Sequence, residues 1–122
     1  MKYFLLLVSV AMFVGCSKSN GDKTKPLLVV NTPSPNQQFS QFSNVIISGT
    51  VTDDKMINVV HIIVTNMSNN AEVLNVQHQV NSQNYNINEG FNVTVVATYK
   101  IHIEADDGSG NTSVVEIQVT GM

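Results

Sequence analysis

The sequence predicts an all-β fold, a Greek-key β-sandwich of about seven short strands. Three observations indicate it. After Pro26 no stretch of useful length shows the 3.6-residue period of an amphipathic helix. Apolar and polar residues instead alternate in short runs that are rich in Val, Ile and Thr. Clusters of Asn, Gly, Ser and Pro separate these runs, as turns would.

Four strands are predicted in the first part of the domain. They cover residues 27–30, 45–51, 57–65 and 72–80. Pro33 and Pro35 end the first strand, because proline has no N–H group to donate to a central sheet pair. Asp53 and Asp54 end the second, and a turn at 66–70 separates the third from the fourth. The inward face of the third strand is predicted from alternation to carry Val60, Ile62 and Val64.

The second part of the domain contains the clearest alternation. Residues 85–87 suggest a short fifth strand, and 91–96 form a sixth strand or its continuation. In residues 98–105 the alternation puts every second side chain on the same face of the strand: Tyr99, Ile101, Ile103 and Ala105. A Gly-rich turn at 106–111 follows, and Val115, Ile117 and Val119 define the last strand.

The first residues of the chain have the features of a secretory signal. Lys2 gives a basic start, an apolar run covers 4–14, and Gly15-Cys16 ends it. The run is too short to span a bilayer. Gly15-Cys16 resembles a bacterial lipoprotein lipobox, which implies cleavage before Cys16 and lipidation of its thiol. The expected organisation is a signal peptide at 1–15, a polar flexible tether at 16–25 and one folded domain at 26–122.

Charge excludes one class of partner. The chain has a net charge of −3, contains no Arg, and has only scattered Lys. Without Lys2 of the signal the balance becomes more negative still, so the basic surface that nucleic-acid binding requires is missing. Cys16 is the only cysteine, so no intramolecular disulfide can form and the domain depends on sheet packing.

Two segments carry a family resemblance. Ile47-Ser48-Gly49-Thr50-Val51-Thr52-Asp53-Asp54, with the strand after it, is similar to the B and C strands of bacterial immunoglobulin-like repeats. Residues 99–107 with Gly110-Asn111-Thr112-Ser113 resemble their F strand and F–G turn. The resemblance implies an immunoglobulin-like sandwich in which the Tyr99 hydroxyl anchors a corner. The chain lacks the cysteine pair and the tryptophan of antibody-type domains.

Acidic residues gather in two predicted turns. In an immunoglobulin-like sandwich the B–C and F–G turns lie at the same end, so their oxygen ligands could converge on Ca²⁺. The candidate ligands are Asp53, Asp54, Glu104, Asp106, Asp107 and Asn111. The alternative is that Asp and Asn form turns by capping their own backbone, and no EF-hand spacing is present. Calcium is therefore a possible cofactor, and no other cofactor is expected.

The histidines offer a weaker site. His61 and His102 lie on predicted neighbouring strands, both on the outer face, and could approach each other. His78 lies on the fourth strand. A transition-metal site needs three or four ligands, and only two are placed for one. Surface histidines without a metal are the simpler interpretation.

No enzyme is expected. Lipidation consumes the only cysteine, and the chain has no Gly-x-Ser-x-Gly motif. A carboxylate pair for glycoside cleavage would sit in a small domain without Trp. We expect a non-catalytic binding or interaction module for an envelope protein or a glycan. The alternatives are a structural accessory subunit of an envelope complex and a calcium-stabilised adhesion module.

The resemblances also imply a location. The lipid would anchor the domain in the envelope of a Gram-negative bacterium, and Ser17, in place of the Asp that signals inner-membrane retention, favours the outer membrane; its periplasmic or surface face stays open. The tether would leave from the acidic end of the sandwich. The opposite end, with turns near Pro33, at 66–70 and at 88–90, would then be free for a partner.

Overall fold

A computed structural model describes residues 21–122, so the predicted signal peptide, Cys16 and the first residues of the tether lie outside the described part. The described residues form an all-β structure without helices, which confirms the predicted class. The strands are β1 (Leu27–Thr32), β2 (Gln38–Phe39), β3 (Asn44–Asn66), β4 (Ala71–Asn92), β5 (Thr98–Asp106) and β6 (Thr112–Gly121).

Strands β3 and β4 form one long hairpin with a bend near its middle. They pair antiparallel from Asn66 with Ala71 at the turn to Asn44 with Asn92 at the far end. The register shifts between Thr52 and Val59, and the buried positions change there from odd numbers to even numbers. Extra residues in one strand reverse which side chains face the core and bend the strand. The bend therefore lets both halves of each strand bury an apolar side.

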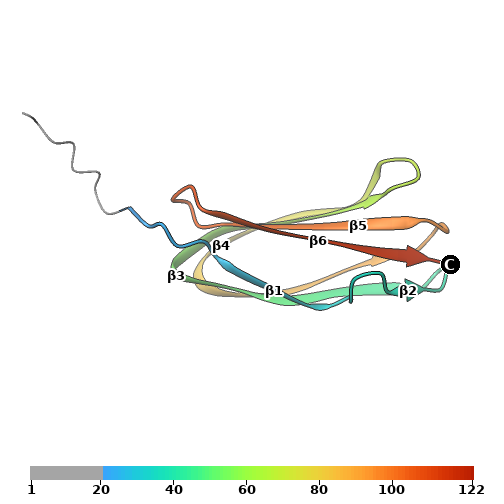
Figure 1. Ribbon diagram of the computed structural model, residues 1–122, viewed down its shortest axis with the longest axis horizontal. Helices are drawn as coiled ribbons and strands as arrows, with labels where there is room; N and C mark the ends of the chain where they lie inside the picture. Colours follow the sequence, from blue (N-terminus) through green and yellow to red (C-terminus); the bar gives the residue numbers. More distant parts are fainter. Residues whose placement is uncertain (1–20) are drawn as a thin grey trace, which may run out of the picture.

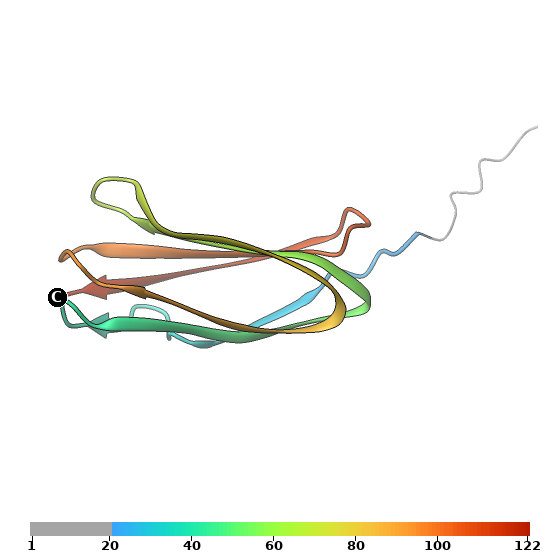
Figure 2. The same cartoon turned by 180° about the vertical axis from the view of Figure 1, so that it is seen from behind.

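The bend makes the sheet curl over on itself. The first half of β3 lies between β1 and the second half of β4, whereas its second half lies between β5 and the first half of β4. β6 pairs with β5 and carries β2 as a parallel strand on its other side. The two halves of the sheet face each other, as in a β-sandwich (Figure 1, Figure 2).

The core lies between the two halves of the sheet. The predicted inward face of β5 is confirmed, because Tyr99, Ile101, Ile103 and Ala105 are all fully buried. The predicted inward face of the second half of β3 is confirmed in the same way by Val60, Ile62 and Val64. The Phe91 ring lies 5.4 Å from the Tyr99 ring and joins β4 to β5. Removal of this apolar area from water is the main favourable contribution to folding.

The predicted strand boundaries need three corrections. The second and third predicted strands are one strand, β3, and the fourth and fifth join the start of the sixth in β4. Residues 88–90 were predicted as a turn, but they lie inside β4 and pair with Ile46, Ile47 and Ser48 of β3. The sixth predicted strand stops at Asn92, so 93–97 is the connection to β5. Short β2 was not predicted, since two residues carry no periodic signal.

The two ends of the domain differ. The chain enters at the end that carries the bend of β3 and the turn between β5 and β6 (Figure 1). The turn between β3 and β4 and the C-terminus lie at the other end (Figure 2). Two predicted turns, near Pro33 and at 66–70, belong to that second end, so it stays a candidate surface for a partner.

Candidate functional site

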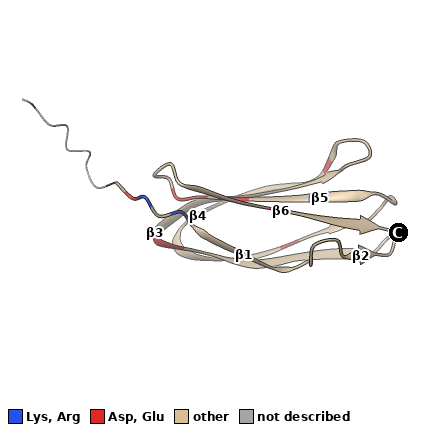
Figure 3. Ribbon diagram, viewed as in Figure 1, with Lys and Arg blue, Asp and Glu red and all other residues tan. Residues whose placement is uncertain are grey.

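Three aspartates meet at the end where the chain enters. Asp22 lies in the segment before β1, and Asp53 and Asp54 lie at the bend of β3. One carboxylate oxygen from each lies within 4.8 Å of the other two. Figure 3 shows acidic positions of the incoming chain, the β3 bend and the β5–β6 turn gathered at this end. Asp22, Asp53 and Asp54 are called the aspartate cluster below.

Asp53 is the buried member of the aspartate cluster. It is only 9% exposed. Its Oδ1 atom accepts hydrogen bonds from the backbone N–H groups of Lys55 at 2.9 Å and Met56 at 3.0 Å. These bonds satisfy backbone donors at the bend, which is why the chain continues through two aspartates that were predicted to end a strand. Its Oδ2 atom is buried and has no hydrogen-bond partner among the described residues.

The turn between β5 and β6 holds the incoming chain in place. Asp107 Oδ1 accepts from the N–H groups of Ser109 at 2.7 Å and Asn111 at 3.1 Å. The Asn111 side-chain amide donates to Asp107 Oδ2 at 2.6 Å and to the carbonyl oxygen of Asp22 at 2.9 Å. Ser113 also donates to the Pro26 carbonyl. Asp22 is therefore fixed by the domain although it precedes the first strand.

The cluster is electrostatically crowded. The Thr24 N–H bond lowers the pKa of Asp22, but desolvation, the Asp107 carboxyl and repulsion from Asp54 together raise that pKa above its ordinary value. Desolvation raises the pKa of Asp107, but the bonds from Asn111 and Ser109 outweigh it and hold the pKa below its ordinary value. No ion pair in residues 21–122 includes any of these carboxylates. The site therefore carries negative charge that no lysine neutralises.

The structure places the six predicted calcium ligands in three separate pairs. Asp53 and Asp54 belong to the aspartate cluster, and Asp107 and Asn111 lie against Asp22. Glu104 and Asp106 alternate with the buried residues of β5 and so lie on its outer side. Glu104 is 3.5 Å from His102 Nε2, and Asp106 Oδ1 accepts from the Gly108 N–H. These two residues are not part of the cluster.

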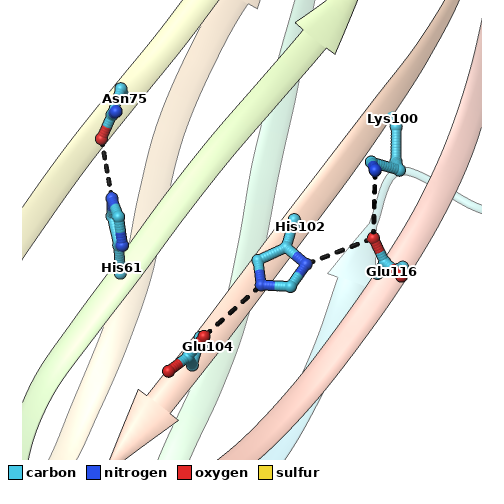
Figure 4. A network of polar contacts seen from close by, with 6 residues as sticks. All are labelled: His61, Asn75, Lys100, His102, Glu104 and Glu116. Carbon is cyan, nitrogen blue, oxygen red and sulfur yellow. Dashed lines mark hydrogen bonds and ion pairs between the residues drawn. The ribbon is translucent and has the colours of Figure 1, made fainter. Parts of the chain in front are cut away.

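The histidines do not form a shared site. His61 Nε2 bonds to Asn75 Oδ1 at 2.7 Å, away from His102 (Figure 4). His102 lies 3.2 Å from Glu116, and Glu116 is also 3.6 Å from Lys100 (Figure 4). His78 lies 2.6 Å from Glu89 on its own strand. Within residues 21–122, the only grouping of three or more His, Cys, Asp or Glu with metal-binding geometry is the aspartate cluster.

Tyr99 contacts the connection between β4 and β5. Its ring is fully buried, and its hydroxyl donates to the Val95 carbonyl oxygen at 2.7 Å. The Val95 N–H donates back to the same hydroxyl at 3.3 Å. This contact fixes the connection between β4 and β5 against the core.

Asp22 is the residue that sequence reasoning missed. It stands in the polar segment predicted as a flexible tether, where composition alone gives no sign of a fixed position. A usable signal was present in the topology, because a first strand that begins at the acidic end places the preceding residues beside the same turns. The expected exit of the tether from that end points to Asp22.

Comparisons with other proteins add no assignment. No family model matches the chain, and no curated protein matches its sequence. Among residues 21–122 there is no helix of the length and apolarity needed to cross a membrane. Buried carboxylate oxygens that converge from two segments, and that have no partner in the described part of the chain, can hold a hard cation.

Proposed function

We propose that residues 26–122 form an immunoglobulin-like domain held at the bacterial outer membrane by a lipid on Cys16. The domain acts as a non-catalytic module that binds a protein partner in the envelope. The partner contacts the free edge of β4. The anchor rests on the Gly15-Cys16 motif, and the binding surface rests on the pairing of the strands.

Strand order and one side-chain contact support the immunoglobulin-like assignment. The halves of β3 fall in opposite halves of the curled sheet, and the connection at 93–97 crosses from one to the other. β2 pairs in parallel with the last strand. The contact of Tyr99 with Val95 stabilises the corner before β5, as a tyrosine corner does. In place of a disulfide the core has the packed rings of Phe91 and Tyr99.

The free edge of β4 is the observation that carries the binding proposal. β4 pairs only with β3 in the described part of the chain. Its 22 residues contain no Lys, Arg or Pro, and the bend of the hairpin divides its free edge into two shorter stretches. Natural proteins commonly protect an exposed edge with such residues, because unpaired N–H and C=O groups recruit another strand. This edge lacks those residues and is available for strand addition by a partner.

Side chains along the first half of β4 favour a partner strand there. Leu74, Val76 and Val80 pack against the core and are only partly buried. A strand added beside 71–80 would cover their remaining apolar surface and satisfy the free backbone groups. Burial of apolar surface and the new backbone hydrogen bonds would both contribute to binding affinity. Alternate side chains of the added strand would supply sequence specificity.

Exposed aromatic rings give less support to a glycan partner. Phe91 is buried, and Tyr85 and Phe39 are partly buried. Phe42 is the one ring of the four that is largely exposed, at 78%. A sugar-binding platform needs a set of exposed rings on one surface, so a protein partner is favoured. A purely structural spacer would not need an unprotected edge.

Photo-crosslinking in intact cells tests the edge. A photoreactive residue at Gln77 on β4 is expected to give protein adducts, whereas one at Gln118 on β6 is not. Val73→Lys places a charge on the β4 edge and should abolish the Gln77 adducts. Val114→Lys makes the same change on β6, at a side chain that is also exposed, and should leave them. Equal adducts from both positions, or none from either, would argue for the spacer.

The anchor is tested separately. Labelling with a fatty-acid probe should mark the wild-type protein and not Cys16→Ser, which should leave the membrane fraction. Ser17→Asp should move the protein from the outer to the inner membrane. A labelled Cys16→Ser protein would rule out the lipid at this position.

A further inference from the structure

Two buried oxygens in the aspartate cluster have no hydrogen-bond partner among residues 21–122. They are Asp53 Oδ2 and Asp22 Oδ2. A buried acceptor without a donor is costly, and a charged one more so. Nearly all such groups in folded proteins are satisfied by protein, water or an ion. The pair therefore needs an explanation.

Hydrogen bonds within turns satisfy only one of the two oxygens of each carboxylate. Asp53 Oδ1 binds the Lys55 and Met56 N–H groups, and Asp22 Oδ1 accepts from the Thr24 N–H at 3.0 Å. The second oxygen of each is left over. No ammonium group in residues 21–122 forms an ion pair with them. The Asp107 carboxyl lies against the Asp22 carboxyl and raises its pKa, so Asp53 Oδ2 is the oxygen that most needs a partner, and a cation bound by the cluster would supply one.

We propose that Asp22, Asp53 and Asp54 bind a calcium ion. Oxygens on opposite sides of a Ca²⁺ ion, each about 2.4 Å from it, lie about 4.8 Å apart. The three carboxylate oxygens lie within 4.8 Å of one another, so one ion can contact all of them. Water reaches the exposed Asp54 side and completes the six to eight ligands that Ca²⁺ takes.

Calcium fits better than the other divalent ions. All three ligands are carboxylate oxygens, which suit hard cations and not the nitrogen- and sulfur-seeking metals. Mg²⁺ demands near-ideal octahedral geometry and gives up its water reluctantly. A buried Asp53 oxygen that must contact the ion directly therefore favours Ca²⁺.

The ion would join the incoming chain to the domain. Asp53 and Asp54 belong to β3, whereas Asp22 belongs to the segment before β1. The Asn111 amide already donates to the backbone carbonyl of Asp22. The ion would add a second attachment, through the side-chain carboxylate of Asp22. Calcium therefore fixes the direction in which the chain enters the domain. This inference does not depend on which partner the β4 edge binds.

Calorimetric titration and thermal melting of the full chain in detergent test the site. We expect one Ca²⁺ per chain, with a dissociation constant of about 10⁻⁴–10⁻³ M, as in extracellular modules. At ten times the dissociation constant the melting midpoint should rise by roughly 7 °C. Asp53→Asn and Asp54→Asn should each weaken binding at least about tenfold. Asp54 is exposed, so its variant tests the site even if Asp53→Asn fails to fold.

Glu104→Gln is the matched control. It removes one negative charge from the same end of the domain but lies outside the cluster, so calcium affinity should not change. Wild-type protein that does not bind at 5 mM Ca²⁺, or equal binding by Asp54→Asn, would overturn the proposal. An equal shift of the melting midpoint with Mg²⁺ would overturn the assignment to calcium.

Hydrogen exchange tests the role of Asp22. Calcium should slow exchange of the Thr24 N–H at least about tenfold in the wild type, because ion binding fixes its acceptor. In Asp22→Asn this protection should be lost, while weaker calcium binding by Asp53 and Asp54 remains. Unchanged protection in Asp22→Asn would show that the ion does not hold the incoming chain.

Discussion

The Tyr99 hydroxyl makes two hydrogen bonds with one residue, Val95: it donates to the carbonyl oxygen at 2.7 Å and accepts from the N–H at 3.3 Å. Val95 lies in the connection between β4 and β5, and Tyr99 is buried in the core. The pair therefore ties an irregular segment to the most buried strand. It explains how the chain keeps a fixed path where it passes from one half of the sheet to the other.

Tyr99→Phe should destabilise the domain by about 1–2 kcal/mol, because both Val95 groups lose a partner and only part of that loss is recovered by water. The ring keeps its packing against Phe91, so the fold should persist. Urea unfolding measures the difference. Tyr85→Phe is the control, since its hydroxyl has no hydrogen bond to the described residues; it should change stability by less than about 0.5 kcal/mol. Equal effects of the two variants would contradict the role of the Val95 contact.

Gly49→Ala should destabilise the domain by about 1–3 kcal/mol, because overpacking forces the backbone to shift. A Cβ atom at Gly49 would overlap the Val29 carbonyl oxygen, so β1 would have to move away from β3. Gly90→Ala is the milder comparison, since its Cβ would first meet the Asn44 side chain at 2.9 Å, which can rotate. Thermal unfolding of the two variants should therefore rank Gly49→Ala as the less stable. If Gly90→Ala were the less stable variant, β1 would be able to move away from β3 at little cost in stability.

Glu116→Gln should show a pH-dependent loss of stability. The hydrogen bond from His102 lowers the pKa of Glu116; desolvation opposes this shift and the charge of Lys100 adds to it. A pKa that is lower in the folded state stabilises the protein above the unfolded-state value of about 4.3. That contribution is lost as the pH falls through the folded-state pKa. Urea unfolding should show a small gap to wild type at pH 7 that closes below about pH 4. A gap that is constant down to pH 3 would contradict this.

The buried face of a strand could be predicted where the alternation of side chains is regular. Tyr99 to Ala105 alternate without interruption, and their buried face follows from the two-residue period alone. The bend of β3 was not predictable in the same way. Asp53 and Asp54 are ordinary strand-ending residues, but Asp53 bonds the backbone of the bend and lets pairing resume after it.

The candidate site was predicted only in part, because one of its residues is placed by a contact that is distant in the sequence. Asp53 and Asp54 stand next to each other in a recognisable turn, so their end of the domain could be inferred. Asp22 is brought to them by the Asn111 amide, a contact across 89 positions of the chain that no local pattern encodes. Glu104 lies close to the turn in sequence, but strand alternation turns it to the outer face.

Asn111→Asp should release the incoming chain and destabilise the domain by about 1–2 kcal/mol. The change removes the amide that donates to the Asp22 carbonyl and to the Asp107 carboxylate. The bond to the carboxylate is charge-assisted and is the stronger of the two. It also adds a carboxylate beside Asp22 and Asp107. Hydrogen exchange at Thr24 and urea unfolding, both without calcium, measure the two effects.

Asn111→Ala separates the lost bonds from the added charge. It should destabilise the domain less than Asn111→Asp, because the same donors are lost without new repulsion. Salt screens buried charges less than exposed ones, and Asp107 is buried, so the gap between the two variants should narrow only partly between 0.05 and 0.5 M NaCl. Calcium should narrow it further in the same assay, because an ion at the aspartate cluster offsets the added negative charge. A gap that responds to neither salt nor calcium would show that Asn111 acts through hydrogen bonding alone and that the charge of this end does not govern its stability.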